Sequence, residues 1–207
     1  SKEYNINMKL YVIRHGQTDW NVKEKCQGRT DIELNNTGIK QAQNAKEQLK
    51  KYKIDLIICS PLKRTRKTAE IINETINSEI IIDERIIERG YGNLEGKTDE
   101  EWKEIVGDNV SIVNYYNLNW NKQNIEPIQD ICKRVWEVLD EIKEKYNDKN
   151  VLLVTHGGTC RAINAYFNAN MDFLNEKVNK ELFYSHFPIY TKPKDACPTQ
   201  YTTTSNV

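Results

Sequence analysis

Residues 8–16 of the chain are Met8-Lys9-Leu10-Tyr11-Val12-Ile13-Arg14-His15-Gly16. The apolar part predicts a buried β-strand over residues 10–13, because short apolar runs are typical of strands covered on both faces. Arg14 offers a rigid fork of donors that suits phosphate, and His15 is largely neutral and nucleophilic near neutral pH. Gly16 lets the backbone approach a neighbour closely. The stretch therefore predicts a strand that ends in a site for attack on an anion.

Length and composition limit the alternatives. The 207 residues contain no repeat, low-complexity tract or Pro/Gly linker, which predicts one domain over residues 1–207. Thirty basic residues balance thirty acidic ones, so charge gives no case for binding nucleic acid or a membrane. No apolar stretch approaches the ~20 residues of a membrane span, and the N-terminal residues are too polar for a signal peptide.

The chain has five scattered cysteines without a CxxC pair: Cys26, Cys59, Cys132, Cys160 and Cys197. This pattern favours reduced thiols over a disulfide framework or a zinc site. We therefore expect a cytoplasmic protein.

Apolar runs alternate with segments of helical periodicity along the chain. Strands are predicted at residues 10–13, 54–59, 80–82 and 151–154, and helices at about 37–51, 61–75, 128–146 and 159–168. The alternation predicts an α/β fold, a three-layer α/β/α sandwich with a mainly parallel sheet and helices on both faces. Residues 98–125, rich in Trp, Tyr and Asn, are expected to form a small cap insertion. The role of the tail, residues 186–207, stays open, although edge strands are allowed there.

His15 and His156 are two of only three histidines, and each follows a predicted strand and precedes a glycine. Ligands of parallel α/β sheets bind at the carboxyl ends of the strands. We therefore expect Arg14, His15 and His156 to share one pocket. A hydrogen-bonded turn residue is the alternative for one such histidine and a weaker one for the pair.

Further segments accompany this pair in a characteristic order. Arg14-His15-Gly16-Gln17-Thr18-Asp19-Trp20-Asn21 is followed by Gln27-Gly28-Arg29, Cys59-Ser60-Pro61-Leu62-Lys63-Arg64, Glu88-Arg89-Gly90-Tyr91-Gly92 and Val154-Thr155-His156-Gly157-Gly158. In this order the set resembles the histidine phosphatase superfamily, also called the phosphoglycerate mutase-like family, over roughly residues 8–170.

The resemblance implies a role for each matching position. His15 would be the nucleophile that forms a phosphohistidine, with one ring nitrogen attacking phosphorus and the other held by a backbone carbonyl. Arg14 and Arg64 would bind phosphoryl oxygens, and His156 would donate to them and stabilise the transition state. Glu88 would protonate the leaving alkoxide and then activate water. Positions that would contact phosphate or substrate are Asn21, Gln27, Gly28 and Gly157.

Alternatives remain for several of these residues. Without the resemblance, Arg64 is better explained as a solvated helix residue. For Asn21, Gln27 and Gly28 the alternative is ordinary hydrogen bonding within a loop. Glu84 and Glu95 compete with Glu88 for the role of acid. Glu88 is favoured because it stands four residues before Gly92, as the family's acid stands before its aromatic-glycine pair, whereas Glu95 fits a turn.

The resemblance covers both mutases and phosphatases, which differ in the cap. Sixty-eight positions separate Glu88 from His156, which is short for a cofactor-dependent phosphoglycerate mutase, and Asp99 stands where the mutases have a lysine. Between residues 98 and 130 the basic side chains are Lys103 and Lys122, with no arginine, so a bisphosphate would be poorly neutralised. Residues 88–92 are nevertheless closer to the mutase spelling, Glu-Arg-His-Tyr-Gly, than to the Phe-Gly of many phosphatases, which keeps that alternative open.

We therefore expect a metal-independent phosphomonoesterase that uses no cofactor and acts on a small phosphorylated metabolite. A phosphoglycerate mutase is the alternative, and a non-catalytic phospho-ligand-binding module is a third one. A homodimer stays open. The cap aromatics either suit an organic leaving group or pack on the core: Trp102, Tyr115, Tyr116 and Trp120.

Overall fold

The computed structural model describes residues 8–106, 123–168 and 199–202. Its strands are β1 (Lys9–Arg14), β2 (Leu56–Cys59), β3 (Glu79–Ile82), β4 (Asn150–Thr155) and β5 (Thr199–Thr202). Its α-helices are α1 (Asp19–Val22), α2 (Asn36–Leu49), α3 (Lys63–Ile76), α4 (Asp99–Val106), α6 (Ile128–Lys145) and α7 (Gly157–Asn168). Two 3₁₀ turns, η1 (Glu84–Ile86) and η2 (Gly92–Leu94), lie between β3 and α4.

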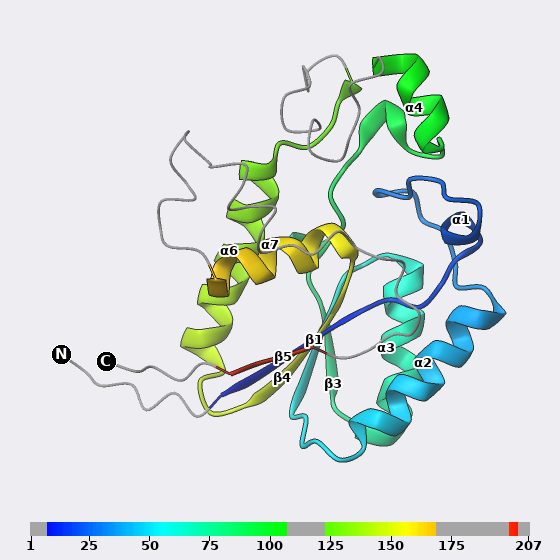
Figure 1. Ribbon diagram of the computed structural model, residues 1–207. Coiled ribbons are helices and arrows are strands. Elements are labelled where there is room, and N and C mark those ends of the chain that lie inside the picture. The colour runs from blue at the N-terminus through cyan, green and yellow to red at the C-terminus, as the bar shows by residue number, and fades with distance from the viewer. Residues whose placement is uncertain (1–7, 107–122, 169–198, 203–207) are drawn as a thin grey trace.

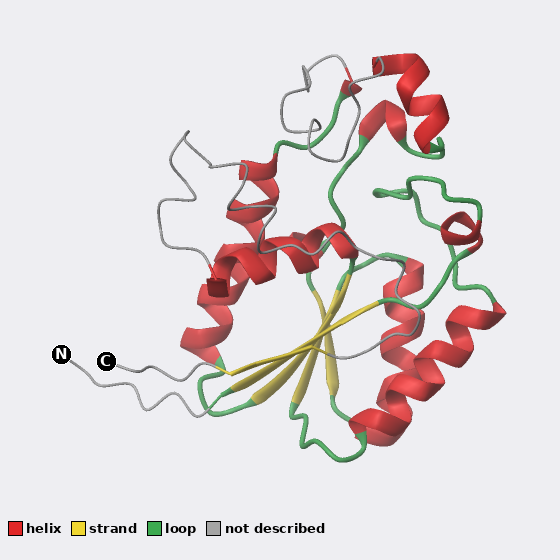
Figure 2. Ribbon diagram, viewed as in Figure 1, coloured by secondary structure: helices red, strands yellow, loops and turns green. Residues whose placement is uncertain are grey.

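The strands form one sheet in the order β3-β2-β4-β1-β5 (Figures 1 and 2). The first four are parallel, and β5 runs antiparallel to β1 at the edge. In this register Arg14 lies opposite Thr155, and Cys59 lies opposite Val154. The carboxyl ends of β1, β2 and β4 therefore meet at one edge of the sheet. The described part of the tail thus supplies an edge strand.

Helices cover both faces of the sheet, which confirms the predicted α/β class. The β1 side chains alternate between the two sides: Tyr11 and Ile13 pack with α2 and α3, whereas Leu10 and Val12 pack with α6 and α7. All four are at most 3% exposed. The strand is apolar throughout because each of its faces is covered by a helical layer.

Two helix starts differ from the predicted ones. Helix α3 begins at Lys63 rather than at Pro61, with Leu62 at its N-cap. Helix α7 begins at Gly157 rather than at about Thr159, because the amide of Cys160 already bonds to the carbonyl of His156 at 2.8 Å. The second correction brings the helix N-terminus directly against the histidine.

The predicted cap lies partly outside the described residues, which end at 106 and resume at 123. Within it, Trp102 of α4 is 5% exposed, packs with Leu94 and Ile125, and donates its indole N–H to the Leu94 carbonyl at 3.0 Å. Packing on the core is therefore the correct explanation for this aromatic. The other three, Tyr115, Tyr116 and Trp120, lie outside the described residues.

Three features of the described segments bear on the sequence predictions. Each cysteine there is a free thiol: Cys26, Cys59, Cys132 and Cys160. No helix in these segments combines the length and apolar character needed to cross a bilayer. Nor do they contain a group of three or more His, Cys, Asp or Glu side chains that could hold a metal ion.

Candidate active site

The two predicted histidines meet at the carboxyl edge of the sheet. The amide of His15 bonds to the carbonyl of Thr155 at 3.0 Å, which continues the β1–β4 ladder by one residue. The ring centroids of His15 and His156 are 5.3 Å apart, and both residues are at most 5% exposed. Parallel pairing of β1 with β4 therefore brings the two histidines together.

The imidazole of His15 has a defined tautomer. Its Nδ1 lies 2.7 Å from the carbonyl oxygen of Gly16, which can only accept, so Nδ1 carries the proton and Nε2 keeps its lone pair. The Gly16 backbone packs so tightly that an added Cβ would overlap the Gly38 carbonyl oxygen. The expected close approach therefore occurs between these two glycines.

Arg64 is fully buried, so the alternative interpretation of this residue as a solvated helix residue is wrong. Its Nε donates to Nε2 of His15 at 3.3 Å. Its terminal nitrogens donate at 2.7 Å each to the carbonyls of Gly28 and Thr30. The loop after α1 thus orients the guanidinium against Nε2 of His15.

Arg14 lies beside the N-terminus of α7. A Cβ added to Gly157 would come within 3.6 Å of the Arg14 guanidinium carbon. A helix N-terminus presents unpaired amide donors and a partial positive charge, both of which favour an anion. Arg14 and Gly157 therefore contribute to the same positive region.

His156 is held by a residue that the sequence analysis did not assign to the site. Its Nε2 lies 2.6 Å from the hydroxyl of Ser60, which follows β2 and bonds through its amide to the Val154 carbonyl at 3.0 Å. Its Nδ1 is buried and has no hydrogen-bond partner among the described residues. The signal for this contact in the sequence was the position of Ser60 directly after a predicted buried strand.

Glu88 reaches the same helix N-terminus from the loop after η1. One carboxylate oxygen accepts from the Arg89 amide at 2.8 Å, and the other accepts from the Gly158 amide at 3.2 Å. The residue is 9% exposed. Glu88 therefore contacts the first turn of α7, the helix that directly follows His156.

The two competing glutamates lie elsewhere. Glu84 is exposed on η1. Glu95 accepts from the amides of Arg29, Thr30 and Tyr91 at 2.9–3.0 Å and from the Thr30 hydroxyl at 2.6 Å. It therefore fastens the loop whose carbonyls hold Arg64, in keeping with the turn role expected of it.

Arg134 of α6 is a second residue that sequence reasoning missed. It donates at 2.6–3.2 Å to the carbonyls of Arg85, Ile87 and Glu88, and it forms an ion pair at 2.7 Å with Glu126. These bonds tie the segment that carries Glu88 to α6. An arginine inside an amphipathic helix gave no local signal, because its partners are distant backbone carbonyls.

The remaining predicted positions take part in loop structure. Asn21 and Thr18 form a capping box at the start of α1, in which the Thr18 amide donates to the Asn21 side chain at 2.9 Å. The Thr18 hydroxyl lies 2.9 Å from the Gln27 side-chain oxygen. Gly28 offers its carbonyl to Arg64. A contact of Asn21, Gln27 or Gly28 with substrate stays a prediction.

Comparison with known proteins identifies the family of this chain. A model of the histidine phosphatase superfamily (branch 1) matches residues 10–176. The chain belongs to the histidine phosphatase superfamily.

Similar members of this superfamily carry phosphatase and mutase names. The chain is 39% identical over 152 residues to the uncharacterized phosphatase PhoE of Bacillus subtilis, with 73% of each protein covered. It is 31% identical over 161 residues to the probable phosphoglycerate mutase GpmB of Escherichia coli, covering 72% of this chain and 70% of GpmB. A mycobacterial glucosyl-3-phosphoglycerate phosphatase, solved with VO3, superposes with a TM-score of 0.67 at 29% identity, covering 77% and 79% of the two chains.

In this superfamily member, burial keeps both site histidines neutral. Burial lowers the pKa of His15 well below its usual range, and the nearby charges of Arg14 and Arg64 lower it further. Burial likewise lowers the pKa of His156, with Arg64 as the next cause. The unprotonated imidazole is therefore the stable form of both residues near neutral pH.

The same shifts predict that acid destabilises the fold. Below pH ~6.5 the unfolded chain protonates histidines that stay neutral when folded, so stability is complete above this value and falls as the pH drops through it. Each histidine contributes a loss on the order of 1 kcal/mol at pH 5.5. We expect the free energy of urea unfolding to fall by about 1 kcal/mol less between pH 7.5 and 5.5 in His156→Gln than in the wild type. Equal losses in the two proteins would contradict the shift.

Proposed function

We propose that the protein is a metal-independent phosphomonoesterase that hydrolyses small phosphorylated metabolites through a phosphohistidine on His15. The observation that carries this proposal is the orientation of the His15 imidazole, whose Nδ1 lies 2.7 Å from the Gly16 carbonyl oxygen and whose Nε2 lies 3.3 Å from Nε of Arg64. The phosphatase names among the relatives support hydrolysis. The free thiols support a reducing compartment, and we propose the cytoplasm.

In the first step the lone pair on Nε2 of His15 attacks phosphorus. The N–P bond forms as the bond from phosphorus to the ester oxygen breaks, and that oxygen takes a proton from the carboxyl group of Glu88. Arg14, Arg64 and the N-terminus of α7 stabilise the charge on the phosphoryl oxygens. The alcohol then leaves.

In the second step water attacks the phosphorus of the phosphohistidine. Glu88, now ionised, accepts a proton from this water as the O–P bond forms. The N–P bond breaks, its electron pair returns to Nε2, and phosphate leaves. One carboxyl group therefore serves both half-reactions.

His156 fits the role of a donor to the phosphoryl group. When the Ser60 hydroxyl donates to Nε2 of His156, the ring proton lies on Nδ1, the buried nitrogen without a partner among the described residues. A phosphoryl oxygen satisfies such a donor, and a neutral N–H bond to it strengthens as negative charge develops. This role requires the serine to fix the tautomer.

The proposal is tested with the wild-type protein, p-nitrophenyl phosphate and a panel of phosphorylated metabolites. We expect phosphate release at an unchanged rate in excess EDTA, because two arginines, two histidines and a helix N-terminus supply the positive charge. Loss of activity in EDTA, restored by a divalent ion, would overturn the metal-independent mechanism.

The second candidate is a cofactor-dependent phosphoglycerate mutase. The segment Glu88-Arg89-Gly90-Tyr91-Gly92 and the similarity to GpmB favour it. The same protein is therefore assayed for interconversion of 3- and 2-phosphoglycerate with and without 2,3-bisphosphoglycerate. Stimulated interconversion faster than phosphate release would decide for the mutase.

A further inference from the structure

The main chain at Glu88 is held by arginines from two distant segments. Its carbonyl oxygen accepts from Nε of Arg29 at 3.2 Å and from a terminal nitrogen of Arg134 at 3.2 Å. The other terminal nitrogen of Arg134 donates to the carbonyls of Arg85 and Ile87 at 2.6 and 2.7 Å. The segment from residue 85 to residue 88 is therefore fixed through its backbone, by bonds that do not involve the Glu88 carboxyl group.

Glu126 joins the two arginines. Its carboxylate pairs with Nε of Arg134 at 2.7 Å and with Arg29 at 3.2 Å, and it accepts from the Gly90 amide at 3.1 Å. Burial raises the pKa of Glu126, but the bond to Arg134 and the charges of Arg134 and Arg29 outweigh this effect and lower it. The carboxylate is therefore ionised, and its three donors form one charged cluster. We call the side chains of Arg29, Glu126 and Arg134 the Glu126 network.

This network reaches the other side of the site as well. Arg29 lies between Gly28 and Thr30 in the sequence. The carbonyls of these two neighbours accept from the Arg64 guanidinium at 2.7 Å each. One loop therefore holds Arg64 through its backbone and the carbonyl of Glu88 through the side chain of Arg29.

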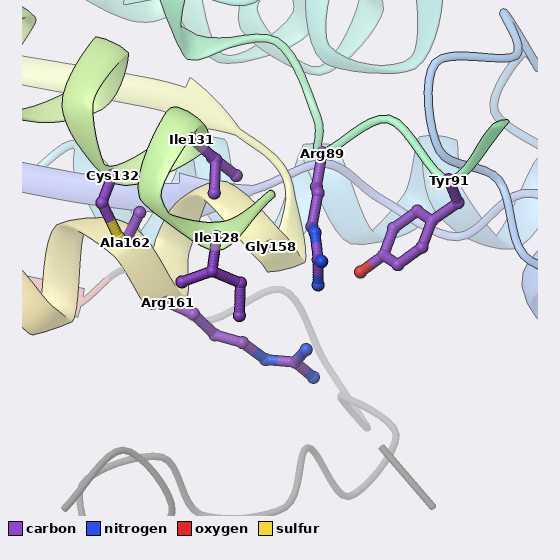
Figure 3. A pocket seen from close by; sticks show the side chains of 8 residues that line it. All are labelled: Arg89, Tyr91, Ile128, Ile131, Cys132, Gly158, Arg161 and Ala162. Atoms are coloured by element: carbon purple, nitrogen blue, oxygen red, sulfur yellow. The ribbon is translucent and has the colours of Figure 1, made fainter. Parts of the chain in front are cut away.

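The space that the Glu88 carboxylate occupies is narrow. The Gly158 amide donates to it at 3.2 Å, and a Cβ on Gly158 would lie 2.5 Å from Glu88 Oε1. The next residue, Arg89, is 5% exposed, donates to the Glu126 carbonyl at 2.8 Å, and lines a small cavity together with Gly158 and Arg161 (Figure 3). A small displacement of the backbone at residue 88 would therefore break the contact of its carboxylate with α7.

We propose that the Glu126 network positions Glu88 for proton transfer. It holds the backbone of residue 88 in the place from which the carboxyl group reaches the leaving oxygen and then the attacking water. The inference rests on the proposed function, in which Glu88 is the acid and the base. Arg29, Glu126 and Arg134 act in this role through Glu88 and need no contact with the substrate.

The first test replaces Arg134 by lysine, which keeps the charge and removes the planar fork. We expect kcat/KM for an alkyl phosphate to fall by about 10–100-fold, because a misplacement of about 1 Å can cost that much. For p-nitrophenyl phosphate, whose leaving group departs without a proton, kcat/KM should fall far less. The inhibition constant of inorganic phosphate should stay unchanged, because the groups that bind phosphate remain in place.

A double-mutant cycle with Glu88→Gln separates positioning from a general loss of structure. In the Glu88→Gln background, Arg134→Lys should change kcat/KM for the alkyl phosphate by less than about twofold, because no acid is left to position. An equal fall in both backgrounds would overturn the positioning role. A Glu88→Gln variant that lowers kcat/KM equally for both esters would instead overturn the proposed acid, so the two failures are distinguishable.

Arg29→Gln repeats the test at a side chain that is 45% exposed and so avoids a buried substitution. It removes one of the two bonds to the Glu88 carbonyl and should also lower the rate for the alkyl ester preferentially, by a smaller factor. An unchanged ratio of the two esters in both Arg29→Gln and Arg134→Lys would contradict the proposal.

The matched control is Arg85→Lys. The Arg85 side chain pairs with Asp83 and with Glu141 of α6 at 2.7 Å each, so it attaches the same segment to the same helix without a bond to the Glu88 carbonyl. This variant should keep the wild-type ratio of the two esters. A loss of the ratio as large as in Arg134→Lys would show that any loosening of this segment has the same effect, and would overturn the assignment to the Glu126 network.

Discussion

Replacing His15 by alanine is expected to lower kcat for p-nitrophenyl phosphate by about 10⁴-fold or more, because the covalent route is lost with its nucleophile. Arg14, Arg64 and His156 stay in place, so phosphate binding should weaken far less than turnover falls. The measurement is phosphate release by both proteins, with inorganic phosphate as a competitive inhibitor to report binding.

The intermediate gives a second readout of this prediction. Acid-labile, base-stable phosphate should be trapped on the wild-type protein after rapid quenching and should be missing from His15→Ala. Thermal unfolding of the variant serves as the control for an intact fold. Equal turnover in the two proteins, or an equal yield of trapped phosphate, would contradict a nucleophilic His15.

Replacing Glu88 by glutamine should separate substrates by their leaving groups. For an alkyl phosphate, which needs a proton on the departing oxygen, kcat/KM should fall by about 10²–10⁴-fold. For p-nitrophenyl phosphate, whose leaving group departs as a stable anion, kcat/KM should fall much less. Because water activation is also impaired, this substrate should then show a burst of nitrophenol followed by slow turnover.

Glu84→Gln is the matched control for this variant. It makes the same change four residues earlier, at an exposed position of η1, and should leave both substrates unaffected. An equal fall of kcat/KM for alkyl and nitrophenyl esters in Glu88→Gln would show that Glu88 acts on binding rather than on the leaving group.

Local sequence was sufficient to predict the position of residues that directly follow a strand. The apolar run before Arg14 and His15 predicts a strand buried on both faces, and the structure confirms it. The strand before His156 has the same form, so the meeting of the two histidines followed from parallel pairing. Their approach required only that β1 and β4 be neighbours.

Side chains whose partners are distant in sequence could not be assigned in this way. Arg64 has basic neighbours and looks solvated in sequence, but it is buried because the carbonyls of Gly28 and Thr30 pair with its guanidinium. Arg134 is a similar case, since its bonds go to carbonyls 46–49 residues away. No periodicity or motif encodes such contacts.

The sequence by itself determined the α/β class, the strand ends that carry Arg14, His15 and His156, and the family resemblance, because hydrophobic periodicity and short motifs are local properties. The tertiary structure alone decided that Ser60 bonds to His156 and that the Glu88 carboxylate contacts the first turn of α7. It also decided that Arg89 and Arg161 line one cavity. These juxtapositions depend on sheet order and helix packing, which bring together side chains that no local pattern connects.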